Sequence, residues 1–263
     1  MHIRTMQALC IVAVAASATA ALAQSPFFGD WKMNNDKSHL TGDVVQYSPA
    51  PDGAIKHTAE DRSYTFKTDG KEYTGPTGAL YVWKMIDENN YASSTTRNGI
   101  PLGTMTYKIS ADGKTMVEEF KGTTPSGKSE DDITTYTRVA GTKGLMGSWK
   151  DTDVKIKEDT MMSWKAGPSA DTMRWELPDI KAYVDVSFDG KEAAPIGPTV
   201  PKGLTLSVTK TGPHSLAMVE KIDGKIIEKV SYKLSADGKT LTAIEAPPDG
   251  KAPATIIYER QSM

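Results

Sequence analysis

Apolar and polar residues alternate over several short stretches of the chain. The alternation is clear in Tyr107–Ile109 and Ile226–Leu234, and partial in Tyr183–Phe188. A period of two residues is typical of a β-strand that has one face on a core and the other in solvent. No window after the first residues has a sustained helical period. The pattern therefore predicts strands at a spacing of roughly 10 to 12 residues.

Asp-Gly and Asn-Gly pairs separate the predicted strands, beginning at residues 52, 69, 98, 112, 189, 223, 237 and 249. Such pairs favour type I′ turns, because both central residues need a positive φ and the twist of this turn matches that of paired strands. So many short connections predict an all-β, antiparallel protein. With about 8 to 10 strands in so few residues, each sheet should close into a barrel or fold into a sandwich.

The chain contains two copies of one unit. The ten residues "YKISADGKTM" at Tyr107–Met116 recur as "YKLSADGKTL" at Tyr232–Leu241, an offset of 125 residues. A unit of roughly 115 residues is far longer than a solenoid repeat, so each copy is expected to have its own core. We predict a first domain over 24–141 and a second over 142–263, joined by a short glycine-bearing linker.

The two ends of each unit carry the same motifs. Each copy opens with Gly-x-Trp, at Trp31 and Trp149, and closes with Tyr-x-Arg, at Arg138 and Arg260. These motifs resemble those of the lipocalins and fatty-acid-binding proteins, the calycins, and the duplicated chain resembles exported bacterial lipocalin-like proteins. In calycins the Trp closes one end of an up-and-down barrel and the Arg lies across it. The resemblance implies two tandem barrels in which Trp31 pairs with Arg138 and Trp149 with Arg260.

The first residues predict export. Arg4 precedes an apolar run of small residues, and Ala21-Leu22-Ala23 has the form of a secretory cleavage site. We expect a signal peptide over 1–23 and a periplasmic or secreted mature protein without a membrane span. Cys10, the single cysteine, lies in this leader. The mature chain therefore has no disulfide, no thiol nucleophile and no thiolate metal ligand.

Charge and chemistry exclude several classes of function. The 31 Lys and Arg residues are interspersed with 33 Asp and Glu residues, so no basic stripe for nucleic acid is present. His39, His57 and His214 do not recur between the copies, and we expect no catalytic histidine, metal or cofactor. Glu118-Glu119 and the acidic run 130–132 are possible carboxylate pairs. Adjacent residues on a strand point to opposite faces, so we expect both runs to be solvated.

Aromatic residues and methionines that share strand faces are the candidates for lining a pocket. They are Tyr64, Phe66, Trp83, Met85, Met105, Tyr107, Trp164 and Trp175. In the second copy Val208 and Lys210 stand where the first has Trp83 and Met85. The first barrel is therefore the favoured site, and the two copies are not expected to bind the same molecule.

Three hypotheses about function remain. The first is a carrier or sensor that holds a small apolar or amphipathic molecule inside one barrel. The second is a non-catalytic interaction module with two solid cores. The third is a hydratase or isomerase on a barrel scaffold that uses an interior carboxylate, for which Asp185 is the first position to inspect. An interior acid without a cationic partner would favour the third hypothesis.

Overall fold

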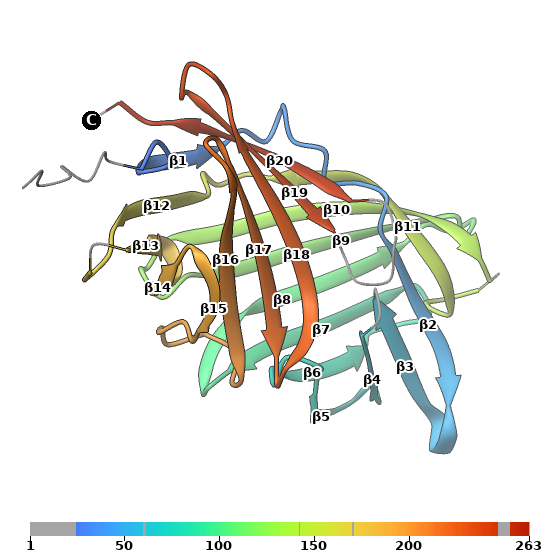
Figure 1. The fold of residues 1–263 in the computed structure, drawn as a ribbon. Coiled ribbons are helices and arrows are strands. Elements are labelled where there is room, and N and C mark those ends of the chain that lie inside the picture. Colours follow the sequence, from blue (N-terminus) through green and yellow to red (C-terminus); the bar gives the residue numbers. More distant parts are fainter. Residues whose placement is uncertain (1–24, 60–61, 142, 170, 247–252, 263) are drawn as a thin grey trace, which may run out of the picture.

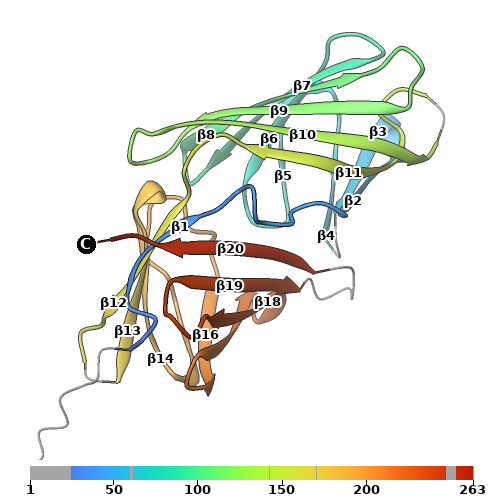
Figure 2. The same cartoon turned by 90° about the horizontal axis from the view of Figure 1, so that it is seen from above.

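The computed structural model describes residues 25–59, 62–141, 143–169, 171–246 and 253–262, which form an all-β protein. Over these residues the strands form two antiparallel sheets of ten strands each, and each sheet curls into a nearly closed barrel (Figures 1 and 2). The predicted fold class is therefore confirmed. The expected signal peptide, 1–23, and Cys10 lie outside the described residues.

Consecutive strands pair along most of both sheets. The first barrel contains β2 (Val44–Ala50), β3 (Ala54–Ala59), β4 (Arg62–Phe66), β5 (Asp69–Thr74), β6 (Leu80–Met85), β7 (Asn90–Arg97), β8 (Ile100–Ile109), β9 (Thr115–Thr123), β10 (Ser129–Ala140) and β11 (Gly147–Ile156). The second contains β12 (Met161–Ala166), β13 (Thr172–Leu177), β14 (Ala182–Ser187), β15 (Asp189–Ala193), β16 (Leu204–Gly212), β17 (Ser215–Ile222), β18 (Lys225–Leu234), β19 (Thr240–Ala246), β20 (Ala254–Arg260) and β1 (Gly29–Met33). Two short 3-10 turns lie at Pro51–Gly53 and Pro178–Ile180.

Each barrel contains one strand from the other copy of the repeat. β1 lies between β12 and β20, and β11 lies between β10 and β2 (Figure 1). The pairing implied by the calycin resemblance is therefore wrong. The Arg138 guanidinium lies 3.9 Å from the ring centroid of Trp149, and that of Arg260 lies 4.2 Å from Trp31. The boundary near residue 141 marks the sequence repeat, but the sheets do not follow it.

The short connection after β10 gives a reason for the exchange. Residues 141–146 are all that separate β10 from β11, and sequence neighbours joined by a short connection usually pair. Gly141, Gly144 and Gly147 have φ values of 87°, 56° and 133°, which glycine adopts readily and which turn the chain back sharply. We call the position beside the closing strand of each repeat unit, β10 or β20, a slot. Because β11 fills the slot beside β10, β1 takes the matching slot beside β20.

The two slots are chemically alike. The Trp31 indole N–H donates to the Phe27 carbonyl at 3.0 Å, and the Trp149 indole N–H donates to the Leu145 carbonyl at 2.9 Å. Both indoles are fully buried, and each stacked arginine donates to three backbone carbonyls. A Cβ on Gly29 would collide with the arginine above it, which explains the glycine of the Gly-x-Trp motif.

The Asp-Gly and Asn-Gly pairs adopt two kinds of backbone conformation. Asp52, Asn98 and Asp223 have positive φ together with the glycine that follows, as a type I′ turn requires. At 69, 112, 189 and 237 only the glycine has positive φ, and the aspartate accepts a hydrogen bond from the backbone N–H of the next lysine. Five of the seven described pairs therefore lie in turns, three of them of type I′, whereas the pairs at 69 and 189 begin β5 and β15 next to a β-bulge. The pair at 249 lies outside the described residues.

The second barrel closes more completely than the first. Tyr183 of β14 and Ile196, which follows β15, exchange two backbone hydrogen bonds of 2.9 and 2.7 Å. The corresponding edges of the first barrel are β4 and β5, and the described residues form no backbone pair between them. The first barrel therefore keeps an opening beside β4.

Candidate ligand-binding site

Five of the predicted binding residues gather in the core of the first barrel. Tyr64, Phe66, Trp83, Met105 and Tyr107 belong to one apolar cluster. The indole of Trp83 stacks between Phe66 and Tyr107, with ring centroids 4.3 and 4.8 Å away. Its N–H donates to the Tyr64 hydroxyl at 3.1 Å. The strand-face alternation therefore found the aromatic centre of this barrel.

The other three predicted residues lie elsewhere. Trp164 and Trp175 are cross-strand neighbours in the second barrel. Met85 is 56% exposed at the end of β6, so its inclusion in the set is wrong. It alternates with Trp83 as the sequence indicates, but the strand extends past the core at that end.

Glu118 of β9 is an acid in the interior of the first barrel. It shares the inward face with the fully buried Met116, and it lies opposite Tyr107 of β8 and Thr134 of β10. The residue as a whole is half-buried, and protein atoms surround much of its carboxyl group. The surroundings of the carboxyl group matter more, because its oxygens carry the charge. The expectation that Glu118-Glu119 is solvated is therefore wrong for Glu118.

The carboxyl group of Glu118 has no partner for its charge. It makes no hydrogen bond or ion pair with any residue that the structure describes. Burial raises the pKa of Glu118 to about 7, because the charged form loses its hydration and gains no compensating contact. Near neutral pH this group can therefore both release and accept a proton.

Four tyrosines lie close enough to this carboxyl group for its charge to raise their pKa values. Burial raises the pKa of Tyr47, Tyr64, Tyr107 and Tyr136, and the charge of Glu118 raises each of them further. Their hydroxyls therefore stay protonated at neutral pH and can donate hydrogen bonds. This shared influence defines one polar centre, to which β2, β4, β8, β9 and β10 contribute.

His57 of β3 belongs to the same centre. Its ring centroid lies 5.0 Å from that of Tyr47 and 5.2 Å from that of Tyr64. Burial lowers the pKa of His57 to about 4, so its imidazole is neutral at pH 7. It can then donate one hydrogen bond and accept another.

Most of this centre is absent from the second barrel. The row of residues across β2, β3 and β4 corresponds to the row across β12, β13 and β14, so Tyr47, His57 and Tyr64 become Trp164, Trp175 and Val184. Glu118 corresponds to Ala243, which is fully buried. A barrel of this type therefore packs well with a methyl group where Glu118 stands.

A cavity of about 300 Å³ opens beside β4 in the first barrel. His57 and Tyr64 line it and also belong to the polar centre, so the cavity and the centre share a wall. Arg62, Tyr81 and Arg97 contribute the other large side chains of its lining. The opening between β4 and β5 thus leads from the surface towards the buried polar groups.

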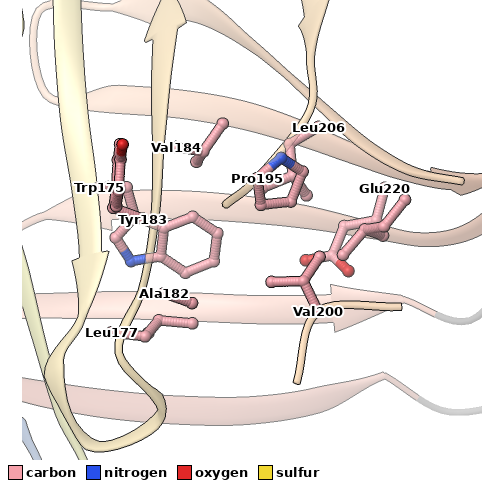
Figure 3. A pocket seen from close by; sticks show the side chains of 10 residues that line it. Trp175, Leu177, Ala182, Tyr183, Val184, Pro195, Val200, Leu206 and Glu220 are labelled. Atoms are coloured by element: carbon pink, nitrogen blue, oxygen red, sulfur yellow. The ribbon is translucent and has the colours of Figure 1, made fainter. Parts of the chain in front are cut away.

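The second barrel holds a smaller cavity of about 130 Å³. Its lining is mostly apolar, with Trp175 and Tyr183 on one side and Glu220 on the other (Figure 3). Burial raises the pKa of Glu220 to about 7, the charge of Glu228 raises it further, and Arg62 of the first barrel lowers it. This volume corresponds to roughly four water molecules, well below the range of small-molecule pockets.

Asp185 is not an interior acid. Its neighbours Val184 and Val186 are buried on the inward face of β14, which leaves Asp185 on the outer face. There it accepts hydrogen bonds from Arg174 Nε at 2.8 Å and Nη2 at 2.7 Å, and this pairing lowers the pKa of Asp185. The choice of Asp185 is therefore wrong. Glu118 could have been found from its alternation with Met116 and from the 125-residue offset, which aligns it with Ala243.

Comparison with protein-family models and with curated proteins finds no match for this chain. In the described part of the chain no helix is long and apolar enough to span a membrane. The described residues also contain no group of three His, Cys, Asp or Glu side chains placed to hold a metal ion. The geometry of the first barrel is therefore the main evidence on function.

Proposed function

We propose that the protein binds a small amphipathic molecule in the first barrel. The observation that carries this proposal is a cavity of about 300 Å³ next to a polar centre that the duplicate barrel largely lacks. Burying a carboxyl group without a partner reduces stability, and a fold that packs with alanine at this position does not need it. A carboxyl group buried at such a cost, in a centre that shares His57 and Tyr64 with a cavity, is a candidate for a functional role.

The second barrel is proposed to support the first. Apart from Glu220, the residues that line its cavity are apolar or aromatic, and the cavity is small, which is close to the solid barrel that the interaction-module hypothesis expects. It also takes up β1, while its own repeat unit supplies β11 to the first barrel. We infer that the duplication has left one binding barrel and one structural barrel.

The arginine–tryptophan stacks support kinship with the calycins, although no family match accompanies them. The leader-like first residues support export, so we propose a periplasmic or secreted carrier. Eight to ten strands give a barrel whose interior either packs solid or holds one small ligand. The two barrels of this chain are proposed to represent these two outcomes.

A thermal-shift screen tests binding directly. Lipids, retinoid-like compounds and neutral aromatic compounds are each added at rising concentration, and a true ligand at 100 times its Kd should add about 2.7 kcal/mol of stability. Filling the first cavity by Ala59→Phe should abolish the response. Filling the second by Val200→Phe should leave it unchanged. A flat response across the panel, or a response lost only in Val200→Phe, would contradict the proposal.

Glu118 favours a second candidate function, proton-transfer catalysis of the hydratase or isomerase type on the bound molecule. A carboxyl group with a pKa of about 7 and no cationic partner suits a general acid–base role. Mass spectrometry and chromatography of a ligand recovered after incubation would decide. A product formed by the wild type and not by a Glu118→Gln variant that still binds supports catalysis. A ligand recovered unchanged supports carriage alone.

A further inference from the structure

We propose that the cavity of the first barrel takes a compact aromatic carboxylate, and that Arg97 binds its carboxylate group. This inference rests on the proposed binding function and names the chemical class of the ligand. It is carried by the hydrogen bonds of Arg97, the charges around the cavity and the shape of the cavity wall.

Arg97 is a half-buried cation that has no acidic partner among the described residues. Its Nη1 donates to the Thr199 carbonyl at 3.3 Å, and its Nη2 donates to Thr77 Oγ1 at 3.0 Å. Nε is buried and has no acceptor among the described residues. Burial lowers the pKa of Arg97, but an arginine stays charged at neutral pH even so. Its positive charge is therefore partly desolvated, and one of its donors is unused.

Three other arginines use the Nε donor that Arg97 leaves unused. Arg138 and Arg260 each donate from Nε and from both terminal nitrogens to backbone carbonyls. Arg174 donates from Nε and Nη2 to the two oxygens of Asp185. Arg97 differs from these three because it combines an unused buried donor with a place on a cavity wall.

The charges around this cavity favour an anion. Its described lining contains two arginines and no acidic residue, and both Arg97 and Arg62 act on the pKa of Tyr81. Arg62 also acts on Glu220 of the second barrel, so we assign the direct contact to Arg97 and an added positive potential to Arg62. A carboxylate bound here would supply the negative charge that Arg97 lacks among the described residues.

The wall of the cavity favours a flat apolar body on that anion. Tyr64 and Tyr81 stack with ring centroids 5.0 Å apart and planes inclined by 23°, and the ring of His57 adjoins Tyr64. The volume of about 300 Å³ corresponds to roughly ten water molecules, which is room for one or two fused rings. A flat aromatic ring could stack against this wall in the same way.

Isothermal titration calorimetry of the full-length protein with 2-naphthoate and with its neutral isostere 2-naphthamide tests the inference. We expect 2-naphthoate to bind at least about tenfold more tightly, since a charge-assisted hydrogen bond contributes about 1.5–3 kcal/mol. Rising salt should weaken the binding of the anion more than that of the amide.

Three variants locate the contact. Arg97→Gln should reduce the affinity for 2-naphthoate to that for 2-naphthamide, and Arg97→Lys should retain part of the difference. The affinity for 2-naphthamide should not change in either variant, which also shows that the cavity is intact. Arg174→Gln is the matched control, because it removes an arginine that is paired with Asp185 on the outside of the second barrel, and it should change neither affinity.

The possible outcomes separate the two proposals. Tighter binding of 2-naphthoate that is lost only in the Arg97 variants supports the inference. Equal affinity for the two probes, or a preference that Arg97→Gln leaves in place, overturns the inference but leaves the binding function standing. Failure of both probes to bind overturns the inference and also counts against the binding function.

Discussion

Glu118 is the residue that best distinguishes the two barrels. Its counterpart Ala243 shows that the same position packs without a polar group. The raised pKa of Glu118 shows that burial disfavours the charged form of its carboxyl group. Residues of this kind reduce stability where they stand and are found at functional sites. The loss of folding stability that Glu118 causes should therefore be measurable.

Replacing Glu118 with glutamine should stabilise the protein at alkaline pH and have little effect at pH 4. The folded protein holds this proton up to a pKa of about 7, against 4.5 for the ordinary group. The wild type therefore loses stability as the pH rises from 4.5 to 7, by at most about 3 kcal/mol, and the loss stays constant above that range. Urea denaturation of both proteins at pH 4 and pH 8 measures the difference.

The control for this experiment is Glu119→Gln on the same strand, because Glu119 is exposed. It should not reproduce the gain in stability that Glu118→Gln gives at pH 8. A Glu118→Gln variant that differs from the wild type by the same amount at pH 4 and pH 8 would show that Glu118 ionises normally. The polar centre would then not be desolvated as the structure indicates.

The sequence predicts the strands and most turns well, but it cannot predict which copy of the repeat supplies a strand. Alternation and Asp-Gly pairs identify β8, β14 and β18 because they depend only on neighbouring residues. The exchange of β1 and β11 depends instead on a choice between two equivalent slots. Since Trp31 of β1 and Trp149 of β11 make the same local hydrogen bonds, the sequences of these two strands favour neither slot. The length of the connection after β10 decides it.

A double-mutant cycle tests the exchange of strands. Trp31→Phe and Arg260→Gln, made singly and together, should show a coupling free energy of about 0.5–2 kcal/mol, the range expected for a guanidinium stacked on an indole. Trp31→Phe and Arg138→Gln should be additive within about 0.5 kcal/mol, because the two residues lie in different sheets. Urea denaturation provides all the values. Coupling of Trp31 to Arg138 and not to Arg260 would place β1 in the first barrel.

At the scale of the whole molecule, the sequence indicates the first barrel as the binding barrel but misses most of its polar groups. The aromatic residues were found because they alternate on strand faces. His57, Arg97 and Glu118 were missed because a polar residue on a strand usually faces solvent, and only the closed sheet shows which way each one points. The opening beside β4 was also invisible in the sequence, because it depends on a missing backbone pair between two distant edges.

Native mass spectrometry of the protein purified from its source tests the central claim that one barrel binds and the other supports it. We predict one small molecule per chain in the wild type, and none in the Ala59→Phe variant, whose first cavity is filled. Two molecules of the same mass on one chain, or a wild-type chain that carries none, would contradict this account.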